Sequence, residues 1–473
     1  MSTAGVASAT AQIDLPDGRV RTELRGLLKL AAPIAATQAG FALMGLVDTA
    51  VVGRLGARQL GAVGLANGLF FAVAVVGLGI MMGLDPLLSQ ALGARDERRA
   101  GELLWQGVWL ALGVTAVLAV PILLSPLLLR PMRVPEAIEA DARAFLLSRL
   151  PGLLPMLLFA GLRASLQAHG ITRPLVVATV LANVANLLLD LLLVFGGGSL
   201  PPWTGPLRAV PPLGAAGAGL ATTLCSVLQV LVLAAAARKL PGHRLHPLPR
   251  RAPHAADLRV ALGVGLPVGL QMGAEVGVFA LVGLLAGRLG EEALAAHQVA
   301  ISLASFTFCF AMGIGQAGSV RVGWAVGAGN TRAARLCGLC AFAVGAGFMS
   351  IAALCFWFFP RQLAALFSGG DEVARASVPL LAVAAVFQIS DGVQGVGAGV
   401  LRGAGDTRFA FAANLFGHYL IGLPIAVVLA FVFGRGVFGL WWGLCAGLSA
   451  VAVCLFARFW WLSSRELRPL EAR

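Results

Sequence analysis

Charged residues are scarce in this sequence. Asp, Glu, Lys and Arg make up 12% of its 473 residues, and 58% of the residues are hydrophobic. A typical soluble domain carries about 25% charged residues. With a mean hydropathy of +0.87, the composition excludes a soluble fold. We expect an all-α polytopic membrane protein, in which the structural unit is an apolar span of about 20 residues.

Cysteines in the pattern of a disulfide framework or a metal-binding domain are also lacking. The seven cysteines lie mostly within apolar runs, and the closest pair, Cys337 and Cys340, falls on a helical stretch. We therefore expect no disulfide framework, no metal centre built from cysteine and no cofactor. The first 26 residues lack the short apolar core of a cleaved signal peptide, so we expect them to form a cytoplasmic tail.

Two functional classes are disfavoured by what is missing. The formal charge of +13 could indicate a nucleic-acid partner. The excess, however, is arginine near the ends of apolar runs, where basic residues set membrane topology. The sequence contains no recognisable cluster of metal ligands and no nucleophile–base pair. We expect neither nucleic-acid binding nor an enzyme, and we assign no catalytic residues.

Apolar segments separated by charged or Gly/Pro breaks predict twelve spans. An even number of spans places both termini on the same side of the membrane. The longest polar loop, residues 238–259, is rich in arginine, which indicates that this side is the cytoplasm. The predicted spans are residues 27–52, 60–84, 103–128, 143–168, 174–195, 213–237, 259–286, 293–318, 336–359, 374–401, 408–433 and 437–462.

The sequence repeats itself at an offset of 234 residues. Pro33 aligns with Pro267, and Gly53-Arg54-Leu55-Gly56 aligns with Gly287-Arg288-Leu289-Gly290. The offset equals six spans, so the two halves have the same orientation and form parallel repeats, as in transporters that rock two bundles around a central site. We predict an N-terminal tail (1–26), an N-lobe (27–238), a basic cytoplasmic linker (239–258), a C-lobe (259–462) and a C-terminal tail (463–473).

Carboxylates inside the predicted spans carry the strongest functional signal. Such residues are costly in a membrane and usually face the bundle interior or a water-filled cavity. An apolar environment favours the neutral acid, so these groups could load and release a proton or hold a partly dehydrated Na⁺. Four acids have this placement: Asp48, Asp190, Glu275 and Asp391. Asn186 lies four residues before Asp190 and therefore shares a helix face with it.

Prolines, glycines and histidines within the spans have mainly structural interpretations. Pro33 and Pro267 permit kinks and are candidate hinges, although a static bend explains them equally well. The closely spaced glycines of residues 392–405 are interpreted as helix packing contacts. The remaining polar residues are expected to be hydrogen-bonded or interfacial: His169, His297, His418 and Asp85.

Three stretches of the chain resemble the multidrug and toxic compound extrusion (MATE) transporters, and the third resembles their NorM-like branch. GLVDTAVVGRLG at 45–56 is similar to the first-span signature. ALAAHQVAISLASFTFCFAMGIGQAGSVRVGWAVGAGNTRAA at 293–334 is similar to the seventh-to-eighth-span region. FQISDGVQGVGAGVLRGAGDTR at 387–408 is similar to the tenth span.

The resemblance implies an exporter of organic cations or amphipathic drug-like compounds, driven by exchange for H⁺ or Na⁺. It further implies a multi-pass protein of the bacterial cytoplasmic (inner) membrane, in contact with lipid. We expect it to be a monomer with alternating access of its two lobes. The native substrate and the choice between H⁺ and Na⁺ stay open.

The resemblance also implies two alternative ion sites. In the NorM-like branch, acids of spans seven and ten form a C-lobe cation site, and they match Glu275 and Asp391. A tyrosine one turn before the second acid helps in some members; Phe387 stands there in this chain, which weakens the case for Na⁺. Other members load the cation in the N-lobe through an Asp of span one and an Asn/Asp pair of span five, which match Asp48, Asn186 and Asp190. A hydroxyl of span six completes that site, and Thr222 is the candidate for it.

Both sets are present, so the sequence does not choose between the lobes. The candidate Na⁺ ligands are accordingly Glu275 with Asp391, or Asp48 with Asp190. The alternative function is a lipid-linked precursor flippase of the same superfamily. Such a flippase would need a cationic lumen to hold pyrophosphate, whereas the mid-span charges singled out here are acids. A passive channel fits poorly with titratable acids inside the spans.

Overall fold

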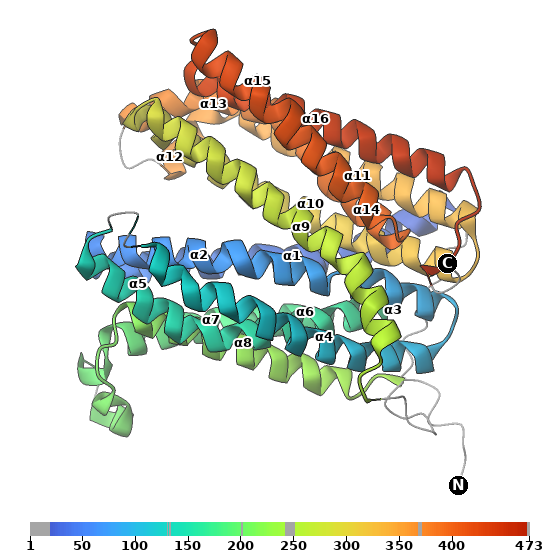
Figure 1. The fold of residues 1–473 in the computed structure, drawn as a ribbon, viewed down its shortest axis with the longest axis horizontal. Coiled ribbons are helices and arrows are strands. Elements are labelled where there is room, and N and C mark those ends of the chain that lie inside the picture. Colours follow the sequence, from blue (N-terminus) through green and yellow to red (C-terminus); the bar gives the residue numbers. More distant parts are fainter. Residues whose placement is uncertain are drawn as a thin grey trace. The chain divides into compact units, whose positions relative to one another are not determined.

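The structure is a computed structural model that describes residues 19–129, 131, 134–199, 202–241, 251–367 and 371–470. Every regular element in these ranges is helical, and none of their residues lies in a strand (Figure 1). Twelve helical segments are long and apolar enough to cross a membrane. The predicted all-α fold with twelve spans is therefore confirmed.

The predicted spans coincide with the observed segments, which are mostly longer. Helices continue for several polar residues past the apolar stretch, because backbone hydrogen bonding does not stop where hydrophobicity does. The twelve segments are Val20–Gly53, Ala57–Gly93, Glu97–Leu127, Glu136–Ala168, Arg173–Phe195, Ala215–Ala237, Ala255–Arg288, Glu291–Gly327, Thr331–Phe358, Arg375–Gly403, Thr407–Val432 and Gly436–Ser463.

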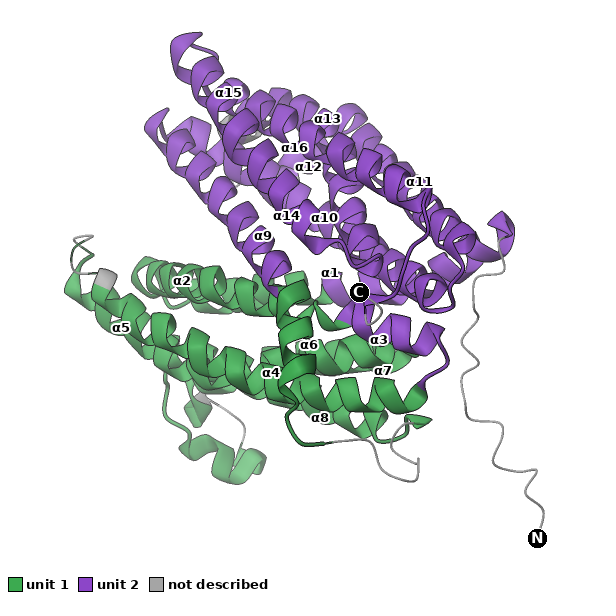
Figure 2. Cartoon of the chain, turned by 45° about the vertical axis from the view of Figure 1, so that its right-hand side comes forward, with its two compact units in different colours: residues 1–12, 39–84, 97–265 green, residues 13–38, 85–96, 266–473 purple. Residues whose placement is uncertain are grey.

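The chain divides into two compact units (Figure 2). Within the described residues, unit 1 consists of 39–84 and 97–265, and unit 2 consists of 19–38, 85–96 and 266–470. Helices α1 (Val20–Gly53) and α9 (Ala255–Arg288) each contribute to both units. The predicted lobe limits stay predictions. Residues 1–18 of the predicted N-terminal tail, 242–250 of the linker and 471–473 of the C-terminal tail lie outside the described residues.

Unit 1 is organised around α8 (Ala215–Ala237), which packs against α5, α6 and α7. Small side chains on α8 permit this close approach. A Cβ atom at Gly217 would lie 2.5 Å from the Leu193 carbonyl oxygen of α7. The other α-helices that lie wholly in this unit are α2 (Ala57–Met81), α4 (Glu97–Leu124), α5 (Glu136–Arg149), α6 (Leu153–Ala168) and α7 (Arg173–Phe195).

Unit 2 is organised around α13 (Asp371–Gly403), which packs against α10, α11 and α16. Side chains at Gly399 and Gly403 would overlap the backbone of α10, so the interpretation of these glycines as packing contacts is confirmed. The other elements of this unit are α3 (Leu84–Gly93), α10 (Glu291–Gly327), α11 (Thr331–Phe358), α12 (Pro360–Phe367), α14 (Thr407–Leu415), the π-helix η7 (Phe416–Gly422), α15 (Leu423–Val427), η8 (Val428–Val432) and α16 (Gly436–Ser463).

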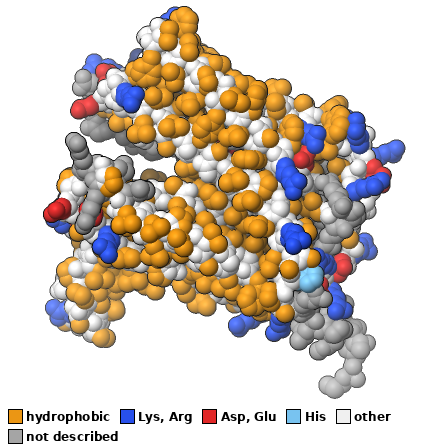
Figure 3. Space-filling view, in the orientation of Figure 1, with side chains coloured by type: hydrophobic (Ala, Val, Ile, Leu, Met, Phe, Trp, Pro, Cys, Tyr) orange, Lys and Arg blue, Asp and Glu red, His pale blue; other side chains and the backbone are white. Residues whose placement is uncertain are grey.

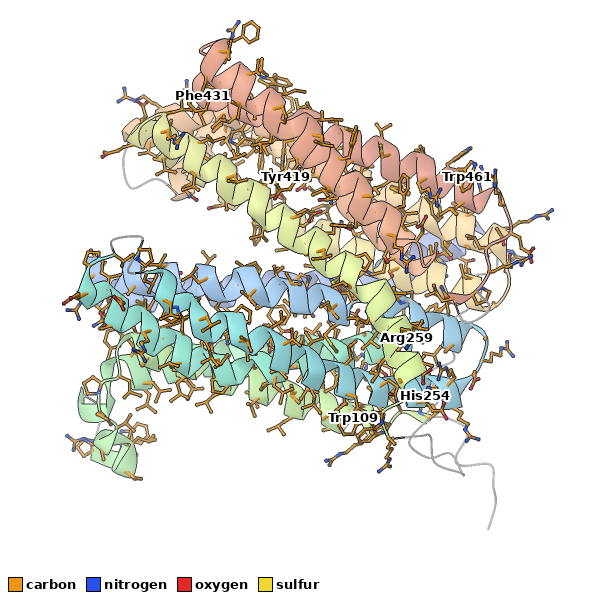
Figure 4. All side chains as sticks on the ribbon, in the orientation of Figure 1. Trp109, His254, Arg259, Tyr419, Phe431 and Trp461 are labelled. Carbon is orange, nitrogen blue, oxygen red and sulfur yellow. The ribbon has the colours of Figure 1, made fainter. Side chains whose placement is uncertain are left out.

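The surface of both units suits a hydrocarbon environment. Hydrophobic side chains cover most of the visible helices, and Lys and Arg gather near helix ends (Figure 3). Trp461, close to the end of α16, illustrates such an end (Figure 4). Its ring centroid lies 4.8 Å from the guanidinium carbon of Arg458 and 3.9 Å from that of Arg465. Tryptophan beside arginine is typical of a membrane–water interface.

Candidate functional site

Glu275 and Asp391 line one cavity within unit 2, which we call the acid cavity. Its volume is about 220 Å³. Glu275 comes from α9 and Asp391 from α13. Phe279, Phe308 and Phe387 contribute aromatic wall from three helices, α9, α10 and α13. Two acids that lie 116 positions apart in sequence therefore share a compartment that is otherwise largely apolar.

Three amide side chains surround Glu275. Its Oε1 accepts a hydrogen bond from Gln271 Nε2, one turn earlier on α9, at 3.3 Å. Gln394 Nε2 of α13 and Asn414 Nδ2 of α14 donate to the same oxygen. These donors offset part of the cost of burying a carboxylate among apolar helices. Asp391 is 6% exposed and interacts electrostatically with Glu275.

Phe387, where the resemblance implies a tyrosine in some members of the branch, lines the acid cavity. It is buried, and its ring packs edge-on against Trp441 at a centroid distance of 5.3 Å and against Phe279 at 6.3 Å. A phenyl ring cannot supply an oxygen ligand. This part of the cavity wall therefore offers a cation an aromatic face and no hydroxyl.

The histidines differ from one another, which corrects one expectation. His169 is hydrogen-bonded, with its Nδ1 2.7 Å from the Ser165 carbonyl oxygen, and Trp441 Nε1 donates to His297 Nδ1 at 3.2 Å. His418 lines the acid cavity and is 1% exposed, yet neither of its ring nitrogens has a hydrogen-bond partner in the described part of the chain. The prediction of hydrogen-bonded histidines thus holds for the first two and fails for His418.

The four predicted N-lobe residues also lie together, within unit 1, and we call them the Asp48 cluster. Asp48 Oδ1 accepts from Asn186 Nδ2 at 2.8 Å, and Asp48 Oδ2 accepts from Thr222 Oγ1 at 3.2 Å. Asp190 is fully buried and interacts electrostatically with Asp48. Residues from α1, α7 and α8 therefore converge as the resemblance implied.

Sequence reasoning missed one member of this neighbourhood, Arg149 at the end of α5. Its guanidinium lies 4.9 Å from the ring centroid of Phe70 and interacts electrostatically with Asp48. Its Nη1 has no hydrogen-bond partner within the described ranges. Arg149 could have been identified from the sequence, because it is a basic residue inside the predicted span 143–168.

Asp85 is buried within unit 2, and its predicted interfacial depth in the membrane stays a prediction. It forms an ion pair with Arg402 of α13 at 3.3 Å, and the two side chains are 4% and 7% exposed. An acid adjacent to Pro86 looked like a span end, but the partner comes from a distant part of the sequence and compensates for burial. Pro33 and Pro267 lie inside the continuous helices α1 and α9, and their hinge role stays a prediction.

The chain is similar to a family model, to named relatives and to solved structures. A family model described as MatE matches the chain twice, over residues 33–192 and 267–428. The two matches start 234 residues apart, which confirms the internal repeat at the predicted offset. The chain is 35% identical over 468 residues to the probable multidrug resistance protein NorM of Bradyrhizobium diazoefficiens, with 96% of this chain and 97% of that protein covered.

A second relative is the multidrug resistance protein NorM of Burkholderia vietnamiensis, 36% identical over 438 residues, with 91% of this chain and 92% of that protein covered. Among solved structures, the eukaryotic MATE transporter AtDTX14 superposes with a TM-score of 0.81 at 24% identity, covering 93% of this chain and 96% of that one. The MATE transporter VcmN of Vibrio cholerae gives 0.80 at 20% identity, covering 95% and 99%. These structures share the fold of this chain.

Proposed function

Because this chain belongs to the MatE family of membrane transporters, we propose that it exports organic cations and drug-like compounds in exchange for H⁺ or Na⁺. Support comes from relatives that carry the name multidrug resistance protein. The single observation that carries the proposal is the placement of Glu275 and Asp391 in one aromatic-lined cavity. Carboxylates attract a cation by charge, and aromatic faces attract it through their quadrupoles.

Exchange follows from competition for the same acids. A proton or Na⁺ that neutralises the carboxylates removes the charge that retains an organic cation. An organic cation in the cavity in turn raises the free energy of binding a second cation there. If the two lobes expose this site alternately to the two sides of the membrane, an inward ion gradient drives the organic cation outward.

The chemistry of the lining speaks against a flippase for pyrophosphate-linked lipids. A site for pyrophosphate needs Lys, Arg or clustered backbone donors. The charged residues among the described lining of the acid cavity are the two carboxylates. An anion would therefore meet like charge, whereas a cation would meet opposite charge.

The proposal also covers the membrane in which the protein lies and its oligomeric state. The distribution of arginine supports a bacterial inner-membrane protein with both termini on the cytoplasmic side. Each chain holds a complete acid cavity within unit 2. A monomer is therefore sufficient for the proposed exchange, and H⁺ or Na⁺ acts as a co-substrate rather than as a resident cofactor.

Efflux from proteoliposomes tests the proposal. A fluorescent organic cation is loaded inside, and either a pH gradient or a Na⁺ gradient is imposed alone. We expect one of the gradients to accelerate efflux, and we expect E275Q and D391N to abolish the acceleration. S390A is the matched control, since Ser390 precedes Asp391 but hydrogen-bonds Ser449 at 2.7 Å. Gradient-driven efflux that survives in both acid variants would contradict the role of the acid cavity.

A further inference from the structure

His418 brings unused hydrogen-bonding capacity into the acid cavity. A neutral imidazole carries one N–H donor and one acceptor nitrogen. Neither nitrogen of His418 is hydrogen-bonded within the described chain, although the residue is 1% exposed. Buried polar groups in native proteins are rarely left unpaired without a reason such as a ligand. The same cavity supplies Glu275 and Asp391 as counter-charges.

The local fold holds His418 in this position from both sides. It belongs to the π-helix η7, and π-helical segments occur frequently at functional sites. One turn earlier, Asn414 donates to Glu275. The next residue, Tyr419, donates from Oη to the Ala274 carbonyl oxygen at 2.9 Å, which ties η7 to α9 (Figure 4). The imidazole therefore faces the cavity on a fixed backbone.

The neighbours of His418 leave it available to a ligand. Its ring contacts Phe279 edge-on at a centroid distance of 6.2 Å, and this contact uses no ring nitrogen. The amide NH2 groups of Gln394 and Asn414 are already engaged, because both donate to Glu275 Oε1. An entering molecule thus meets carboxylate charge, aromatic faces and one unoccupied imidazole within the same small volume.

We infer that His418 accepts a hydrogen bond from the N–H group of a protonated amine substrate whose charge is balanced by Asp391 and Glu275. This inference rests on the proposed function and specifies its substrate class. A protonated amine offers both a positive charge and an N–H donor. A quaternary ammonium ion offers the charge alone, so it would gain the carboxylate and aromatic contacts but leave the imidazole unpaired. His418 is therefore a specificity-determining residue that favours protonated amines over their quaternary analogues.

A matched pair of substrates tests this assignment. Transport of a tertiary amine and of its N-methyl quaternary derivative is measured in proteoliposomes at a pH where the amine is protonated. A hydrogen bond to a charged group corresponds to a preference of about tenfold or more in kcat/KM for the amine. We expect H418F to bring the ratio close to one by raising KM for the amine while KM for the quaternary ion stays unchanged.

H418N is the second variant, because asparagine keeps an acceptor near the position of Nδ1 while changing the shape of the side chain. It should retain part of the preference. An H418F ratio equal to that of the wild type, or a wild type that transports both compounds equally well, would overturn the inference and leave the proposed function intact. A wild type that exports neither compound under any ion gradient would instead refute the proposed function.

Discussion

Arg321 on α10 and Glu23 on α1 form a buried ion pair, in which Arg321 Nε donates to Glu23 Oε1 at 2.7 Å. The two side chains are 3% and 1% exposed. Arg402 and Asp85 form a second buried pair within the same unit. Each pair joins a residue of the first sequence half to a helix of the second half. These contacts give a physical reason why residues 19–38 and 85–96 group with unit 2.

Removing one partner of the first pair should destabilise the protein strongly. An R321M variant leaves the Glu23 carboxylate buried without its counter-charge, which costs roughly 3–5 kcal/mol. The double variant E23L/R321M removes both charges and should lose much less. Thermal unfolding in detergent measures both. Equal stability of R321M and the wild type would show that the pair is not buried as described.

Helix packing at Gly399 should tolerate no side chain. A Cβ atom there would overlap the Gly315 carbonyl group of α10, so G399A forces α10 and α13 apart. We expect a loss of about 1–3 kcal/mol in the free energy of unfolding. G347A on α11 is the control, since a Cβ atom at that position meets no atom within 4 Å. Should both variants unfold like the wild type, the close helix contact is absent.

The last residues of the predicted linker (239–258) are hydrogen-bonded to α4. Arg99 donates to both carboxylate oxygens of Asp257 at 3.0 and 2.7 Å. Trp109 Nε1 donates to the Arg251 carbonyl oxygen at 2.8 Å, in the region where Trp109 and His254 are labelled in Figure 4. These contacts hold residues 251–257 within unit 1.

Loss of this anchor should expose the segment to protease. An R99A variant removes both hydrogen bonds to Asp257, so local opening becomes easier and cleavage near Arg251 should accelerate. R98A is the matched control, because Arg98 pairs only weakly with Glu102 on its own helix at 3.6 Å. Cleavage rates are compared by gel after limited trypsin treatment. A rate for R99A no faster than that for R98A would rule the anchor out.

The amide donors around Glu275 should matter for transport although they carry no charge. Replacing Gln394 or Asn414 by leucine removes one hydrogen bond to the carboxylate, which is worth about 1.5–3 kcal/mol and hence roughly a tenfold loss or more in kcat/KM. Steady-state efflux measures the loss, with S390A as the reference. Unchanged kcat/KM in both leucine variants would mean that the amides are merely structural.

Much of the fold was predictable because the membrane imposes simple rules. Span length, arginine placement and the 234-residue repeat are each readable from local sequence. Asp48 and Asn186 could be grouped through resemblance, and their hydrogen bond agrees with that grouping. The resemblance likewise pairs Glu275 with Asp391, and the two acids line one cavity.

The parts that escaped prediction depend on partners far away in the sequence. The burial of Asp85 gives no local signal, because its ion-pair partner Arg402 lies far away in the sequence. Gln394 and Asn414 were overlooked because a neutral amide gives no signal until the carboxylate it contacts is known. His418 was misjudged for the opposite reason: the sequence cannot show that its expected hydrogen-bond partner is missing.

The most direct test of exchange is to let a gradient of the organic cation drive movement of the coupling ion. Proteoliposomes without any ion gradient are given an organic cation gradient, and the movement of H⁺ or ²²Na⁺ is followed. Because alternating access of a shared site works in both directions, flow of the organic cation in one direction should drive one of these ions in the other, and E275Q/D391N should abolish the effect. Organic cation flow that leaves both ions at rest in the wild type would contradict antiport through the acid cavity.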